Sequence, residues 1–155
     1  MSLEEEISTN GGNGPRHLIF LSKNVFYVAY ELSNQVSVYI NKNNIWECVQ
    51  TISTLTKDCD TKSFASAIKI NGNKLYVSNR GYNSIAIFNI NSDYTLTLDE
   101  IPTLLYDFPR DFYIIDDNLI IIAFQKSNKL VLYKINRTLD EVSSINNLEG
   151  VIGLC

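Results

Sequence analysis

The sequence of 155 residues lacks the features that mark membrane proteins and nucleic-acid-binding proteins. No apolar run approaches the roughly 18 to 20 residues that a membrane-spanning helix requires. The net charge of -4 provides no broad attraction for a phosphate backbone or an anionic lipid surface. We therefore expect neither nucleic acid nor a membrane as a partner.

Cysteine is also scarce. Cys48, Cys59 and Cys155 make an odd number, and no pair has CxxC spacing, which argues against a disulfide framework and a zinc knuckle. We predict reduced thiols and no metal site. Segment 1–14 is acidic and then rich in Asn and Gly, without the basic start or apolar stretch of a secretory signal. It is interpreted as a flexible lead-in, and the expected location is the cytoplasm.

The composition is that of a globular protein. Hydrophobic residues make up 45% of the chain and charged residues only 19%, so the chain is able to bury a real core. β-Branched and aromatic residues dominate the apolar stretches. No stretch shows a 3.6-residue apolar period long enough for a packed helix. These features predict an all-β protein.

An internal repeat is the main signal in the sequence. The segment from Arg16 to Val38 aligns without a gap on the segment from Ala65 to Ile87, at an offset of 49 residues. A third copy, from Arg110 to Leu132, follows at a further offset of 45 residues. Such a period indicates a repeat architecture.

Each copy predicts three strands joined by two short polar turns. In the first copy the strands are expected at 17–21, 25–30 and 36–40. An Asn stands at the second turn of every copy, where its tolerance of left-handed backbone angles favours a tight turn. These residues are Asn34, Asn83 and Asn128.

A fourth, more polar strand follows each copy, expected at 46–53, 96–104 and 142–148. The second strands are apolar on both faces and should be covered on both sides, whereas the fourth strands alternate as at a solvent-facing edge. This pattern predicts a β-propeller of three consecutive four-stranded antiparallel blades, with a β-sandwich or an orthogonal barrel as the alternatives. The blades are expected at approximately 15–55, 63–105 and 109–155.

Propeller geometry brings two sets of polar residues to one rim. The start of each first strand and the end of each second strand meet at the same face, beside the central channel. The residues concerned are Arg16, His17 and Arg110 at strand starts, and Glu31, Arg80 and Gln125 at strand ends. A Glu, an Arg and a Gln at one repeat position are not what packing alone would select.

The predicted rim suits a small anionic ligand. Guanidinium groups bind carboxylate or phosphate at two points, and Glu31 would then act as a base or proton acceptor. The alternative is that these side chains are solvated residues at strand ends. His17 is equally consistent with a packed structural role.

Four segments resemble the lactonase seven-bladed propeller family, which includes bacterial propeller-type 6-phosphogluconolactonase and fungal carboxy-cis,cis-muconate cyclase. They are GPRHLIF at 14–20, YVAYEL at 27–32, LYVSNRGYNSIAIF at 75–88 and PRDFYI at 109–114. The resemblance implies hydrolysis of a sugar-phosphate lactone such as 6-phosphogluconolactone in carbohydrate metabolism, or a related cyclase (isomerase) reaction. It also implies that the reaction needs no cofactor.

The same resemblance assigns roles by position. Glu31 and His17 are the expected catalytic residues, and the expected substrate-binding residues are Arg16, Arg80, Arg110 and Gln125. One departure is Phe124, which stands where the family often has an Asn before the Gln.

Three blades supply under half of a seven-bladed ring. The second hypothesis is therefore a truncated, catalytically incomplete propeller fragment that acts as a self-associating or binding module. Open terminal blades favour such pairing because their strand edges are unpaired. A third hypothesis is a propeller that acts only as an interaction scaffold.

Overall fold

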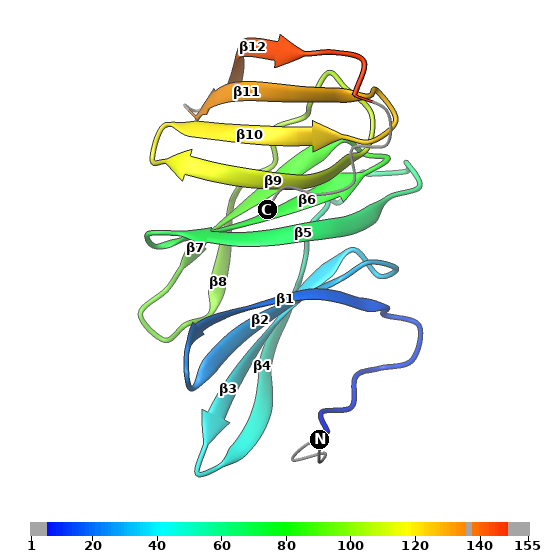
Figure 1. The fold of residues 1–155 in the computed structure, drawn as a ribbon. Coiled ribbons are helices and arrows are strands. Elements are labelled where there is room, and N and C mark those ends of the chain that lie inside the picture. The colour runs from blue at the N-terminus through cyan, green and yellow to red at the C-terminus, as the bar shows by residue number, and fades with distance from the viewer. Residues whose placement is uncertain (1–5, 136–137, 149–155) are drawn as a thin grey trace, which may run out of the picture.

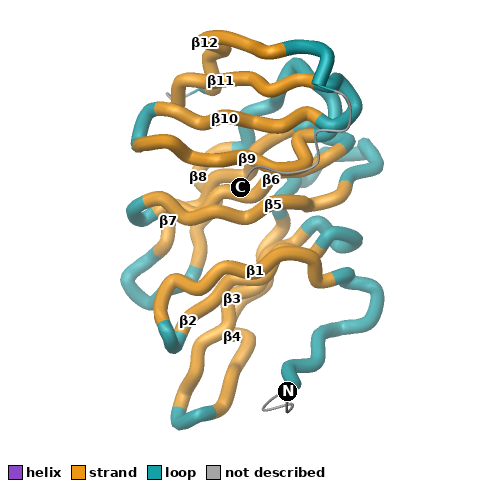
Figure 2. The backbone as a smooth tube through the Cα atoms, viewed as in Figure 1, coloured by secondary structure: helices purple, strands orange, loops and turns teal. Residues whose placement is uncertain are grey.

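The chain folds into three four-stranded antiparallel sheets that follow one another along the sequence (Figure 1). The computed structural model describes residues 6–135 and 138–148. Within these residues there are strands and loops but no helix (Figure 2), and nothing long and apolar enough to cross a membrane as a helix is present. The three-bladed prediction is confirmed, and both alternatives, sandwich and orthogonal barrel, are wrong.

The sheets form blades one, two and three, each with its strands in sequence order. Blade one contains β1 (Pro15–Ser22), β2 (Val25–Tyr30), β3 (Gln35–Lys42) and β4 (Ile45–Ser53). Blade two contains β5 (Phe64–Asn71), β6 (Lys74–Arg80), β7 (Ser84–Ile90) and β8 (Leu96–Glu100). Blade three contains β9 (Pro109–Asp116), β10 (Leu119–Phe124), β11 (Lys129–Ile135) and β12 (Leu139–Ile145).

The turn from the second to the third strand is built in the same way in every blade. Asn34, Asn83 and Asn128 have φ values of 52°, 50° and 51°, in the left-handed region that Asn tolerates better than most residues. Their carbonyl oxygens accept hydrogen bonds from the backbone N–H groups that follow the outer strands, at Thr54, Leu104 and Leu148. The repeat predicted these left-handed turns, and the structure adds that each Asn joins its turn to the end of its own blade.

The core lies between the blades, because strand residues alternate between two faces. On β6, Leu75 and Val77 pack toward blade one, while Tyr76 packs toward blade three. On β10, Ile120 and Ile122 complete the second cluster. The second strands are thus covered on both sides, as their apolar sequences predicted.

The outer strand of blade two is shorter than the sequence indicated. β8 ends at Glu100 rather than near Leu104, and Pro102 follows two residues later. Proline has no N–H to give to the sheet, so the pairing stops there. A single bridge between Ser84 and Thr103 continues the contact with β7.

Candidate active site

Strand pairing brings the ends of the first and second strands of each blade together. Pro15 pairs with Tyr30 in blade one, and Phe64 pairs with Arg80 in blade two. In blade three, Pro109 pairs with Phe124. All of these pairs lie at the same ends of their blades, so the six residues predicted at the rim gather at one side of the molecule.

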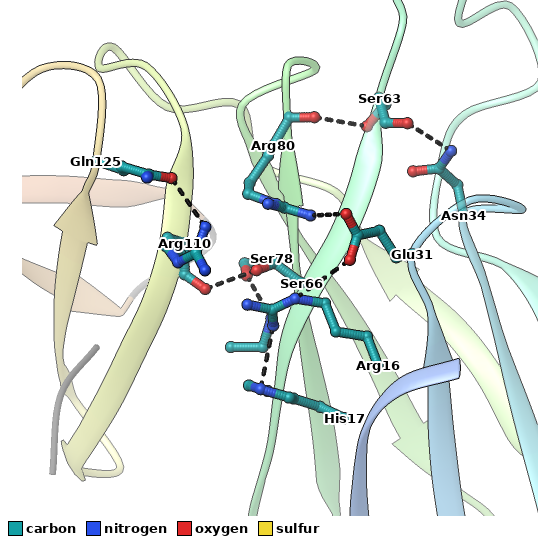
Figure 3. Close-up of polar contacts among 11 residues, drawn as sticks. Arg16, His17, Glu31, Asn34, Ser63, Ser66, Ser78, Arg80, Arg110 and Gln125 are labelled. Atoms are coloured by element: carbon teal, nitrogen blue, oxygen red, sulfur yellow. Dashed lines mark hydrogen bonds and ion pairs between the residues drawn. The ribbon is translucent and has the colours of Figure 1, made fainter. Parts of the chain in front are cut away.

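Glu31 forms the centre of this rim, between two arginines from different blades (Figure 3). Its Oε1 lies 2.8 Å from Nη2 of Arg80, and its Oε2 lies 3.5 Å from Nε of Arg16. The Glu31 side chain is 34% exposed, so one carboxylate is held by two guanidinium groups while part of it faces solvent. A carboxylate in this position is fixed in space and still accessible to water.

Arg80 is buried to an unusual degree for an arginine. Its side chain is only 8% exposed, and its guanidinium lies 5.8 Å and 5.9 Å from the ring centroids of Phe64 and Phe108. Among the described residues, its buried Nε and Nη2 atoms have no aligned hydrogen-bond acceptor. Glu31 therefore balances the charge of Arg80 without saturating its donors.

The backbone around Arg80 is held by hydrogen bonds between blades. Ser63 Oγ donates to the carbonyl oxygen of Arg80 at 3.2 Å, and Asn34 Nδ2 donates to the carbonyl oxygen of Ser63 at 2.9 Å. Figure 3 shows this chain of contacts above the Glu31 pair. The turn residue of blade one thus helps to place the arginine of blade two.

Arg110 and Gln125 form a second pair in blade three. Arg110 Nη1 donates to Gln125 Oε1 at 3.1 Å, and Ser66 Oγ donates to the Arg110 carbonyl oxygen at 2.7 Å. Figure 3 shows this pair beside the group formed by Arg16, Glu31 and Arg80. The arginine–glutamine pair of blade three and the Glu31 group thus lie on the same rim.

Positive charge accumulates at this rim. Burial, followed by the nearby Arg80 and Arg110 cations, lowers the pKa of Arg16 from its ordinary value, while Glu31 opposes this effect. Arginine nevertheless stays protonated under ordinary conditions. The Arg80 and Arg110 guanidinium groups are thus near enough to Arg16 to disfavour its charge, and the Glu31 and Asp111 carboxylates offset part of this effect.

His17 lies beside Arg16 rather than beside Glu31. The distance from its Nε2 to Arg16 Nη1 is 3.2 Å, and arginine only donates, so Nε2 accepts and the ring proton is on Nδ1. Burial, followed by the Arg16 cation, lowers the pKa of His17, which keeps the imidazole neutral at pH 7. His17 thus contacts Arg16 through its acceptor nitrogen.

Comparison with known proteins gives a consistent result. A profile described as "Lactonase, 7-bladed beta-propeller" matches residues 1–150. The chain belongs to the lactonase seven-bladed β-propeller family. A 6-phosphogluconolactonase of Buchnera aphidicola is 37% identical over 145 residues, covering 88% of this chain and 44% of that protein. An uncharacterised protein of Staphylococcus saprophyticus is 32% identical and covers 96% of this chain.

Solved structures show the same fold. The periplasmic gluconolactonase of Pseudomonas aeruginosa superimposes with a TM-score of 0.85 at 26% identity, covering 95% of this chain and 43% of that protein. A Lactobacillus plantarum protein gives a TM-score of 0.84 at 28% identity, with coverage of 95% and 46%. This lactonase-family chain therefore spans less than half the length of the relatives that it matches, and its fold is a partial propeller.

Two residues of the lactonase-family rim were missed by sequence reasoning. Ser66 and Asp111 occupy the repeat position of His17, one residue after Arg110 or its equivalent. Both are buried, and Asp111 Oδ1 lies 3.7 Å from Lys69 Nζ. The Asp111 charge acts to raise the pKa values of Arg16 and His17, but burial and the neighbouring cations lower both values by more. A position-by-position comparison of the three copies would have found both residues.

No three His, Cys, Asp or Glu side chains come together to hold a metal ion in the part of the chain that the structure describes. Cys48 is exposed and Cys59 is half-buried, and both are free thiols. Cys155 lies outside the described residues.

Proposed function

We propose that this chain carries the binding and proton-transfer groups of a hydrolase that opens a sugar lactone bearing a negative charge, such as 6-phosphogluconolactone. The observation that carries the proposal is the placement of the Glu31 carboxylate between the guanidinium groups of Arg16 and Arg80, 3.5 Å and 2.8 Å away. A carboxylate in this position is able to take a proton from water, and the two cations are able to stabilise the negative charge that develops on the ester oxygen during hydrolysis.

In the proposed reaction, Glu31 removes a proton from water while the water oxygen attacks the lactone carbonyl carbon. The carbonyl electrons move onto its oxygen, and Arg16 and Arg80 stabilise that negative charge. The ring C–O bond then breaks, and the proton passes from Glu31 to the departing ring oxygen. The product is an open hydroxy acid, and Glu31 returns to its starting state.

The remaining rim residues have binding and positioning roles in this proposal. Arg110, oriented by Gln125, provides a third guanidinium for the substrate. His17 accepts a hydrogen bond from Arg16 and so acts as a positioning residue. Among the related proteins, one is named a 6-phosphogluconolactonase and another a gluconolactonase, which supports hydrolysis over the cyclase reaction.

The proposal predicts that the chain accelerates hydrolysis of 6-phosphogluconolactone above its spontaneous rate. The acid released would be measured at constant pH, with rates proportional to protein concentration. Arg16→Met should lower the rate by about tenfold or more, because one oxyanion-stabilising charge is lost. Lys23→Met is the matched control, because it removes an exposed cation at the turn between β1 and β2. This variant should hydrolyse the lactone at the wild-type rate. A wild-type rate equal to the spontaneous one would overturn the proposal.

A second candidate, a self-associating binding module, rests on the open flanks of the terminal blades. Leu18 and Phe20 of β1 are 57% and 55% exposed, and Tyr113 and Ile115 of β9 are 51% and 50% exposed. Adjacent blades of a propeller cover such faces, and exposed apolar patches mark interaction sites. We propose that a second copy of the chain covers these faces.

The mass of the chain in solution tests this candidate. Light scattering should give a mass above that of the monomer that increases with protein concentration. Phe20→Lys combined with Tyr113→Lys should return the chain to a monomer. A wild-type monomer at all concentrations would exclude self-association and leave the proposed hydrolysis untouched.

A further inference from the structure

A groove at the junction of blades two and three lies next to the site and has no role in the proposal above. Its volume is about 410 Å³. The groove is lined by residues that precede or begin the first strands, or that follow the second strands, of these two blades. They are Lys62, Phe64, Gly81, Asp107, Phe108 and Lys126.

Two lysines and two aromatic rings define the chemistry of the groove. Lys126 Nζ lies 3.6 Å from the ring centroid of Phe108, and Lys62 Nζ lies 5.4 Å from that of Phe64. Each ammonium group is held over an aromatic face, an arrangement that limits where a long side chain points. Two cations are thus presented from opposite blades.

Arg80 connects this groove to the candidate active site. Its guanidinium packs against the same two rings, Phe64 and Phe108, and also pairs with Glu31 at 2.8 Å. Its buried Nε has no acceptor among the residues that the structure describes. Arg80 therefore contacts both the Glu31 carboxylate and the two aromatic rings of the groove.

The backbone of the groove is held in uncommon conformations. Phe108 has a φ of 63°, which is rare for a bulky residue, and its N–H donates to Asn83 Oδ1 at 3.0 Å. Gly81 has a φ of 95°, and a Cβ at this position would lie 2.2 Å from the Lys62 carbonyl oxygen. Only glycine permits this approach, which brings the Lys62 backbone against blade two.

We propose that Lys62 and Lys126 form a subsite for the phosphate monoester of the substrate, with the reacting lactone at Glu31. This inference rests on the proposed function and adds the group that distinguishes phosphorylated from neutral sugar lactones. Asp107 is the one carboxylate in the lining, and its Oδ1 is held by Asn83 Nδ2 at 2.6 Å. The two lysines outnumber it and are exposed.

Calorimetric titration of the chain with three stable compounds tests the subsite. They are 6-phosphogluconate, gluconate and inorganic phosphate. The wild-type chain should bind 6-phosphogluconate more tightly than either of the others. Lys62→Gln combined with Lys126→Gln should weaken binding of 6-phosphogluconate about tenfold, since each exposed charge contributes modestly, and change gluconate binding less than twofold.

Lys23→Gln, an exposed lysine at the far ends of the strands, is the control and should leave all three affinities unchanged. Equal weakening of both sugar acids by the double variant would overturn the subsite, as would equal wild-type affinity for 6-phosphogluconate and inorganic phosphate. A phosphate preference that depends on the lysines, in a chain without lactone hydrolysis, would retain the subsite and reject the proposed function. Binding of neither sugar acid would overturn both.

Discussion

Glu31→Gln is expected to lower the rate of lactone hydrolysis by about 100- to 10,000-fold, the range that general acid–base catalysis contributes. The amide keeps the size of the side chain and an oxygen near Arg80, but it takes no proton from water. Binding of 6-phosphogluconate should persist, because Arg16 and Arg80 remain and the repulsion from the Glu31 carboxylate is gone. The effect should therefore fall on kcat rather than on KM.

Glu47→Gln is the matched control for this substitution. Glu47 lies on the outer strand β4, where its carboxylate pairs with Lys42 at 2.8 Å, remote from the rim. It should change neither kcat nor KM. A Glu31→Gln variant with wild-type kcat and an unchanged circular dichroism spectrum would show that another group moves the proton.

The second large effect is expected at Asn79, which joins blades one and two. Its side chain is fully buried, and its Nδ2 donates to the Thr54 carbonyl oxygen at 2.8 Å and to Ser84 Oγ at 3.0 Å. Thr54 Oγ1 in turn donates to Asn79 Oδ1 at 2.7 Å. Asn79→Ala leaves these buried groups without partners and should lower the free energy of unfolding by about 3 kcal/mol.

Urea unfolding measures this loss, with Asn73→Ala as the control. Asn73 is an exposed turn residue in the same blade, and its replacement should change stability by less than about 0.5 kcal/mol. Thr54→Val and the double variant complete a cycle, in which the two losses should be strongly non-additive because the residues contact each other. Additive losses would show that the contact between blades contributes little.

The repeat made the fold and the candidate rim predictable. Because the copies align without gaps, Glu31, Arg80 and Gln125 had to fall at equivalent strand ends, and propeller geometry then brings them to one side. The left-handed turns at Asn34, Asn83 and Asn128 followed from the same alignment. Their roles in catalysis and binding remain predictions.

Contacts between blades were not predictable in the same way. Nothing in the sequence indicates that Asn79 pairs with Thr54, since this depends on how two blades pack against each other. Lys62 and Lys126 lie in connecting segments outside the apolar strands, where a charged residue is ordinarily solvated. Only the structure shows that Arg80 packs against Phe64 and Phe108, the same two rings over which these lysines lie.

The central claim is that charged side chains from three blades form one anion-binding rim. Backbone amide NMR shifts on titration with 6-phosphogluconate test it most directly. The account predicts shifts confined to the rim, at residues 14–18, 30–32, 62–66, 79–82, 107–111 and 125–126. Shifts confined to the turns at the other ends of the strands, at 22–24, 71–74 and 116–118, or none at saturating ligand, would contradict it.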